Sequence, residues 1–268
     1  MAVGEPRYRL PSLTWVQKSL LWGALLTLFW MAWPSAGLDE RVVRDTVVYL
    51  LGPGVLAISH GRHLGWRVDR TAVKNAFFLA LFVLPFYLVG SALPSIRAYY
   101  PMWGTTAALG DFLPHAAKQL VVVIAAETYY RGLLCVGVRE LGIASVFISP
   151  VVYALHHLGK PPIELLLSGP TDVLFGAVDY RSTSILPSVV AHGLGLALLD
   201  WLVLHPPRRV SDFDPNGVRS RRRVPIPTTD LRPERSSRRR PSRPLGSFRS
   251  FRSLHPFRQW LGLGLGLG

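Results

Sequence analysis

Four polar side chains in the middle of the chain have the residue types of acid–base chemistry. Glu127 and Arg131 lie four residues apart in an apolar stretch, and His157 and His192 follow in two later apolar segments. On an α-helix, residues at this spacing are separated by about 40° around the axis, so Glu127 and Arg131 share a face. A carboxylate, two imidazoles and a guanidinium can bind a metal ion or activate a water molecule.

The apolar stretches around these residues approach the length of membrane-spanning helices, which need about 20 apolar residues. Three long windows cover 19–37, 75–96, and 119–126 continued by 129–138. Shorter or less apolar windows cover 46–59, 143–158, 162–178 and 183–204. The sequence therefore predicts an all-α fold, a polytopic transmembrane bundle of about seven helices (six to eight).

A charged pair inside such a stretch is unusual. Burying both charges costs more free energy than an exposed pair returns, and ionisable residues within membrane helices generally mark chemistry or transport. Tyr129 and Tyr130 add hydroxyl groups that need polar partners or water at the same depth. The pattern favours an internal cavity that is open to water around Glu127 and Arg131.

The two ends of the chain differ in charge. Residues 205–268 hold 15 arginines against four acidic residues, a net charge of +11 out of +14 for the whole chain. This Arg-, Pro- and Ser-rich composition cannot bury a core and predicts a disordered basic tail. Basic residues before residue 19 and in the loop 60–74 predict that the N-terminus and this loop face the cytoplasm. No small-residue cleavage site follows the first window, so we expect a retained helix there.

Metal ligation is one interpretation of the histidines. His156 and His157 point about 100° apart on a helix, so they cannot chelate one ion together, and no His-Glu-x-x-His pairing occurs. A zinc site formed by Glu127, His157 and His192 stays open as an alternative. The single cysteine, Cys135, excludes an intrachain disulfide and a cysteine-based zinc cage. Water activated by a carboxylate, with no metal and no cofactor, fits the residues best.

Three short motifs occur in order: AETYYRG at 126–132, YALHH at 153–157 and HGLGL at 192–196, with the spacer LFGAVDYRSTSILPSVVAH at 174–192. They resemble the EExxxRG, FxxxH and HxxxN motifs of the CAAX-protease and bacteriocin-processing family of glutamic intramembrane endopeptidases. The resemblance covers about residues 110–204. Three ordered motifs with a matching spacer are more specific than any one of them.

The resemblance implies an intramembrane endopeptidase whose site residues are Glu127, His157, His192 and Arg131. In this scheme Glu127, helped by His157, deprotonates a water that attacks a peptide carbonyl near the membrane surface. His192 donates a hydrogen bond to the oxyanion, and Arg131 orients Glu127 or contacts the substrate. The implied partners are the lipid bilayer and a membrane-anchored protein or peptide substrate, with no nucleic acid.

We expect three regions on this basis. Residues 1–105 form N-terminal transmembrane helices, residues 106–204 form the protease-like core, and residues 205–268 form the basic tail. The Arg-, Pro- and Gly-rich composition suggests a GC-rich bacterial gene. The expected location is therefore the cytoplasmic (inner) membrane of a bacterium, where the substrate would be a protein with a C-terminal membrane anchor.

Two positions depart from the family motifs. Ala126 stands where the family has its first glutamate, the residue expected to activate water, and Leu196 stands where the family has asparagine. Either Glu127 has taken over as the base, or Glu127 is a structural partner of Arg131 and the protein is a catalytically altered pseudoprotease or peptide-binding scaffold. A third hypothesis is a transporter that uses Glu127 and the histidines as a proton relay, although no inverted repeat supports it.

Overall fold

The computed structural model describes residues 12–206, and every regular element in that range is helical. These residues belong to one compact unit. The elements in chain order are α1 (Trp15–Ala32), α2 (Leu38–Asp45), η1 (Thr46–Leu51), α3 (Gly52–Ser59), α4 (Arg70–Gly90), α5 (Pro94–Tyr99), α6 (Leu109–Glu127), η2 (Thr128–Leu133), η3 (Val136–Phe147), α7 (Ser149–His156), α8 (Pro162–Ser182) and α9 (Leu186–Leu204). The all-α prediction is confirmed.

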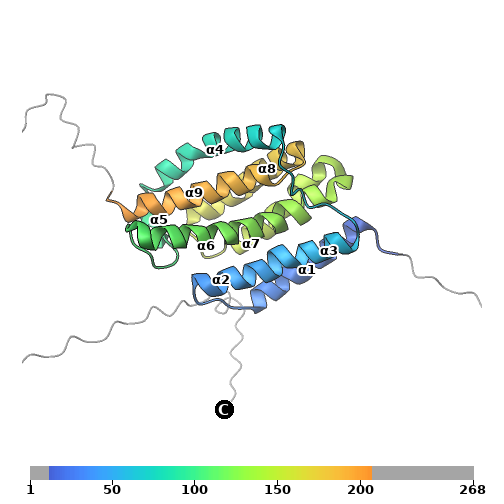
Figure 1. Cartoon of the computed structure of the whole chain (residues 1–268), viewed down its shortest axis with the longest axis horizontal. Coiled ribbons are helices and arrows are strands. Elements are labelled where there is room, and N and C mark those ends of the chain that lie inside the picture. Colours follow the sequence, from blue (N-terminus) through green and yellow to red (C-terminus); the bar gives the residue numbers. More distant parts are fainter. Residues whose placement is uncertain (1–11, 207–268) are drawn as a thin grey trace, which may run out of the picture. The chain divides into compact units, whose positions relative to one another are not determined.

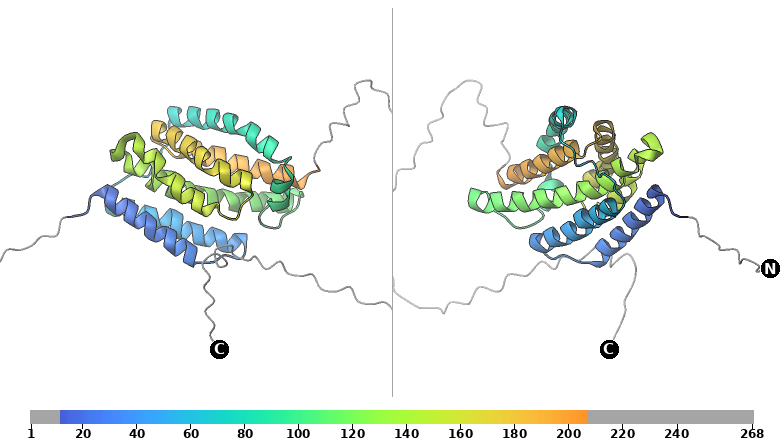
Figure 2. Two further views of the ribbon diagram at one scale, coloured as in Figure 1. Left: turned by 180° about the vertical axis from the view of Figure 1, so that it is seen from behind. Right: turned by 45° about the vertical axis from the view of Figure 1, so that its right-hand side comes forward.

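The helices lie roughly side by side in rows (Figures 1 and 2). Helix α4 lies at one edge and packs along α9, while α1 and the rod formed by α2, η1 and α3 lie at the opposite edge. Helix α6 lies between them and contacts both α9 and α2, and α7 packs against α8. Elements from the middle and the end of the chain therefore meet at the centre of the bundle.

Four of the described helical segments are long and apolar enough to cross a membrane: Leu38–Ser59, Arg70–Gly90, Leu109–Leu133 and Leu186–Leu204. A fifth is obtained if η3 and α7, which are bent by 65° relative to each other, are counted as one span. All seven windows expected from the sequence overlap helices, but the described residues hold only four candidate spans, or five with the bent pair. Helix α1, which contains Gln17 and Lys18, and α8, which contains four charged residues, are not among these candidate spans.

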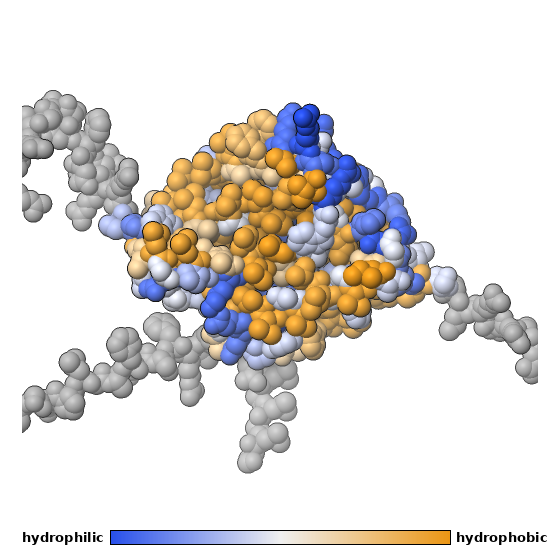
Figure 3. Space-filling view, viewed as in Figure 1, coloured by the Kyte–Doolittle hydropathy of each residue, from blue (hydrophilic) through white to orange (hydrophobic). Residues whose placement is uncertain are grey.

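The outer surface of the bundle is apolar over a broad area (Figure 3). Along α4, the phenylalanines Phe77, Phe82 and Phe86 each leave more than half of their surface exposed. Exposed apolar patches of this extent are unfavourable in water and are accounted for by lipid contact. The protein is an integral membrane protein.

Local signals in the sequence fix the ends of the helices next to the centre of the bundle. The Asp69 carboxylate accepts a hydrogen bond from the Ala72 backbone N–H and begins α4, because it satisfies one of the free donors of the first turn. Thr183 ends α8 in the left-handed conformation, with φ of 53°. The turn that follows reverses the chain into α9.

The expected basic tail, 205–268, lies almost entirely outside the described residues. The division of the preceding chain at residue 105 stays a prediction, as does the side of the membrane that each loop faces. Helix α4, which belongs to the expected N-terminal region, packs along α9 of the expected core.

A glycine sets the distance between α4 and α9. A Cβ atom on Gly195 would lie 2.0 Å from a ring carbon of Tyr87, so any larger residue must displace that ring. We predict that Gly195→Ala lowers the free energy of unfolding by roughly 1–3 kcal/mol because it overpacks the contact. Adding Tyr87→Ala should make the double variant more stable than the sum of the two single effects. Chemical denaturation in detergent micelles measures both.

Gly169→Ala is the matched control, because nothing lies within 4 Å of the Cβ position at Gly169 in α8. Replacing a helical glycine by alanine without a clash is expected to be neutral or to stabilise by up to about 1 kcal/mol. Equal stabilities of the Gly195→Ala and Gly169→Ala proteins would contradict the packing assignment.

Candidate active site

The first motif lies at a change of helix geometry in the centre of the bundle. Helix α6 ends at Glu127, and residues 128–133 wind as the π-helix η2. Single π-helical turns within longer helices are frequent at functional sites. All six residues of η2 are buried, as is Glu127.

Arg131 is shared between two carboxylates. Its Nε lies 3.1 Å from Oε2 of Glu127, and its Nη1 lies 2.7 Å from Oδ1 of Asp172 on α8. None of these three side chains is exposed. The ion pair expected from the spacing of Glu127 and Arg131 is therefore present, and Asp172 is a second partner of Arg131.

Aromatic rings surround the guanidinium group. Its Cζ lies 5.0 Å from the ring centroid of Tyr153, 5.5 Å from that of Phe175 and 5.7 Å from that of Tyr130. Cations are attracted to the faces of such rings, most strongly where water is absent. Three aromatic residues from three elements thus hold Arg131 together with its carboxylates.

His192 on α9 completes this cluster. Its Nδ1 lies 2.6 Å from Oε1 of Glu127, and its side chain is 22% exposed. Both oxygens of Glu127 therefore have partners, one in His192 and the other in Arg131. Three of the four expected site residues, Glu127, Arg131 and His192, are therefore in contact. Together with Asp172 they form what we call the Arg131 cluster.

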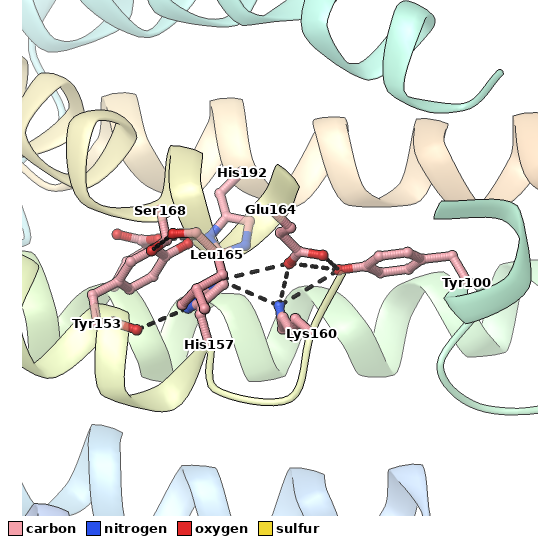
Figure 4. A network of polar contacts seen from close by, with 9 residues as sticks. Tyr100, Tyr153, His157, Lys160, Glu164, Leu165, Ser168 and His192 are labelled. Atoms are coloured by element: carbon pink, nitrogen blue, oxygen red, sulfur yellow. Dashed lines mark hydrogen bonds and ion pairs between the residues drawn. The ribbon is translucent and has the colours of Figure 1, made fainter. Parts of the chain in front are cut away.

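His157 lies in a different set of contacts, shown in Figure 4. Its Nε2 lies 3.3 Å from Nζ of Lys160 and 3.6 Å from Oε1 of Glu164. Lys160 and Glu164 form an ion pair of 2.5 Å, and the Tyr100 hydroxyl donates to both carboxylate oxygens, at 2.9 and 3.0 Å. We call this set, His157, Lys160, Glu164 and Tyr100, the His157 cluster.

Glu127 and His157, which the sequence interpretation assigned to one water, share no hydrogen bond or ion pair in residues 12–206. The physical reason is the bend of 65° before α7, which places His157 at the end of a short helix and beside Lys160 and Glu164. His156 points elsewhere, because its ring contacts the hydroxyl groups of Tyr49 and Tyr130. The divergence of the two adjacent histidines agrees with the helical geometry.

The arrangement gives no support to the zinc alternative. Within the described part of the chain, no three His, Cys, Asp or Glu side chains are grouped so that they could hold a metal ion. Glu127 contacts His192 but not His157, so the three proposed ligands do not converge.

Apolar contacts occupy the two positions that depart from the family motifs. Ala126 packs against the buried cluster that includes Tyr129 and Tyr130. Leu196 packs against the cluster that includes Ile96 and Tyr100. Neither position supplies a polar group to the Arg131 cluster or the His157 cluster.

Four residues of the two clusters were not assigned to the site from the sequence: Asp172, Tyr100, Lys160 and Glu164. A usable signal for Asp172 existed, because Asp172 and Asp179 lie seven residues apart and therefore on one face of α8. Both are fully buried, and Ser149 and Ser188 donate hydrogen bonds to them. Glu164 had no comparable signal, since a carboxylate in the first turn of a helix is commonplace.

Comparison with known proteins finds a similarity for the middle of the chain. No curated protein and no solved structure matches the sequence. Residues 110–197 match the family model described as type II CAAX prenyl endopeptidase Rce1-like. The matched range includes both ends of the Arg131 cluster and the whole of α7 and α8. The resemblance inferred from the three motifs is thus confirmed: residues 110–197 are similar to the type II CAAX prenyl endopeptidase Rce1-like family.

Proposed function

We propose that the protein is an intramembrane endopeptidase that hydrolyses a peptide bond of a membrane-anchored protein by direct attack of water. The observation that carries the proposal is the Arg131 cluster, which lies in the protease-family segment and joins η2, α8 and α9. Three of its members, Glu127, Arg131 and Asp172, have no exposed surface. Buried charges destabilise a fold relative to apolar packing unless their geometry is excellent, so their presence supports a functional role.

The Arg131 cluster supplies positioning. Arg131, which is also paired with Asp172, holds the Glu127 carboxylate, and Glu127 in turn fixes His192 through Nδ1. His192 is the member with exposed surface, and its Nδ1 donates to the Glu127 carboxylate. Its Nε2 would donate to the oxyanion of the attacked carbonyl when the ring is a protonated imidazolium, the form that pairs with Glu127. A donor of this kind typically lowers the barrier by about 3 kcal/mol.

His157 supplies an acceptor for the attacking water. Its Nδ1 lies 2.8 Å from the Tyr153 carbonyl oxygen and must donate to it, so Nε2 carries the lone pair and is the acceptor, here facing Lys160. A neutral imidazole with this tautomer can accept a hydrogen bond from water and strengthen it as a nucleophile. The reaction needs no acyl-enzyme, because water attacks the carbonyl carbon directly.

The substrate we propose is a protein with a C-terminal membrane anchor in the cytoplasmic membrane of a bacterium. The apolar surface and the candidate spans support a substrate that is itself in the bilayer. The name of the matched family also makes a prenylated C-terminal peptide a suitable second probe.

A second candidate function is a pseudoprotease that binds membrane peptides without cleaving them. It is favoured by the complete burial of Glu127, by the partners on both of its oxygens, and by the apolar residues Ala126 and Leu196. The two candidates differ in one measurable property, which is whether the unmodified protein cleaves a substrate.

The first prediction concerns His157. In vesicles that contain the protein and a fluorescent reporter with one C-terminal membrane anchor, we expect cleavage by the unmodified protein and a loss of roughly 10²–10⁴-fold in rate for His157→Ala. His63→Ala is the control, because His63 is an exposed loop residue. Gel analysis of the released domain measures the rate, and equal rates for His157→Ala and His63→Ala would refute the assignment.

The second prediction separates the two candidate functions. If the protein is an active protease, we expect the unmodified protein, which has alanine at position 126, to cleave the reporter. A protein that is inactive as it stands but gains activity with Ala126→Glu would instead be a pseudoprotease that has lost its base. The same vesicle assay, run on both proteins in parallel, gives the answer.

The third prediction tests the Arg131 cluster. Arg131→Ala leaves two buried carboxylates without their cation, so we expect a loss of about 3–5 kcal/mol in the free energy of unfolding. Lys118→Ala removes an exposed ion pair of 2.6 Å with Asp39 and should change stability by at most about 1 kcal/mol. Denaturation in detergent micelles measures the free energy of unfolding of both variants. Equal decreases for Arg131→Ala and Lys118→Ala would contradict a larger contribution of the buried ion pairs to stability.

A further inference from the structure

We infer that Glu164, and not Glu127, is the carboxylate that takes the proton from the attacking water. This inference rests on the proposed function, since it names the base of the same reaction. It assigns a catalytic role to a residue outside the three motifs, in the first turn of α8.

Glu164 is the more exposed of the two carboxylates. The Glu127 side chain has no exposed surface, and its two oxygens contact Arg131 and His192. A general base must come within hydrogen-bond distance of the proton that it removes, so Glu127 would first have to give up one of these partners. The Glu164 side chain contacts Lys160 and Tyr100 but is 21% exposed, so water can reach it from outside once Lys160 moves aside.

The second argument is proximity to His157. Glu164 is the one carboxylate within ion-pair distance of His157 in residues 12–206, with 3.6 Å between Oε1 and Nε2. Because Nδ1 of His157 donates to the Tyr153 carbonyl, Nε2 is an acceptor, and so is the ionised carboxylate. Two acceptors that face each other need a donor between them.

Lys160 supplies that donor in this structure, with Nζ 3.3 Å from Nε2 of His157 and 2.5 Å from Oε1 of Glu164. A water molecule has two hydrogens and can satisfy the same two acceptors. Such a water is polarised by both of them, which raises its nucleophilicity. The His157 cluster thus has the composition of a site that binds and activates one water.

The third argument is that the carboxylate is held in place. The Tyr100 hydroxyl lies 2.9 and 3.0 Å from the two oxygens of Glu164, and the segment that carries Tyr100 lies on the far side from His157 in Figure 4. Fixed orientation of a catalytic group removes part of the entropic barrier of the reaction. Tyr100 is a positioning residue in this scheme and Glu164 is the catalytic one.

The reaction balances as follows. The Glu164 carboxylate accepts one proton from water while the water oxygen bonds to the carbonyl carbon of the substrate, and the electron pair of the C=O double bond moves to the oxygen. When the oxyanion collapses, the C–N bond breaks and Glu164 returns the proton to the amine nitrogen. The products are a carboxyl terminus and an amine, and no oxidant, reductant or co-reactant is consumed.

The test uses the full chain in lipid vesicles with two probes, the C-terminally anchored fluorescent reporter and a farnesylated C-terminal peptide. Glu164→Gln keeps the volume and an acceptor for Tyr100 but removes the base. We expect kcat to fall by roughly 10²–10⁴-fold with little change in KM. Glu140→Gln, which removes the charge of an exposed ion pair with Arg62, is the matched control and should retain the kcat of the unmodified protein.

Glu164→Asp is the second variant, for use if Glu164→Gln fails to fold. It keeps the negative charge that pairs with Lys160, but its side chain is one methylene shorter, so the carboxylate lies farther from His157. We expect its kcat to fall at least about tenfold, as small misplacements of a reacting group have large effects on rate. An unchanged kcat in Glu164→Gln, or in Glu164→Asp where the Gln variant is unfolded, overturns this inference and leaves the proposed function standing. Absence of cleavage of both probes by the unmodified protein overturns the inference and the proposed function together.

Discussion

The centre of the bundle depends on one guanidinium group shared between two buried carboxylates. Arg131 contacts Glu127 from its own helical segment and Asp172 from α8, and all three side chains are shielded from solvent. One positive charge and two negative charges leave a net negative charge, which other groups in the protein interior must stabilise. His192 and Ser149 provide contacts to the outer oxygens of the two carboxylates. The network therefore joins η2, α7, α8 and α9 through a single electrostatic constraint.

That constraint is effective only because the surrounding backbone packs closely. A Cβ on Gly132, the residue after Arg131, would lie 2.9 Å from the backbone oxygen of Leu64, and one on Gly137 would lie 2.6 Å from the oxygen of Gly132. Backbone atoms cannot move aside as a flexible side chain can, so glycine at these positions is a packing requirement. Gly132 of the first motif thus allows η2 to pack closely against the backbone at Leu64, while Glu127 and Arg131 form the ion pair.

The sequence predicted what depends on local spacing. The interval of four residues identified the Glu127–Arg131 pair, and three ordered motifs identified the family segment at 110–197. What it missed depends on how helices meet in three dimensions. The chain bends by 65° before α7, and His157 lies 3.6 Å from Glu164. The size of that angle cannot be predicted from local sequence patterns. The partners of Arg131 and His192 on other helices are tertiary facts of the same kind.

The separation of the two clusters bears on what the missing first glutamate means. Glu127 is held by Arg131 and His192 without any contribution from Ala126, so the Arg131 cluster does not depend on a carboxylate at position 126. Loss of that carboxylate would leave the fold and the orientation of His192 intact and would remove only a base. A base need not come from the same helix, because a carboxylate is effective wherever it shares a water with the acceptor nitrogen of His157. Glu164 lies 3.6 Å from that nitrogen on a different helix from Ala126, and Tyr153, which contacts both His157 and Arg131, links the two clusters.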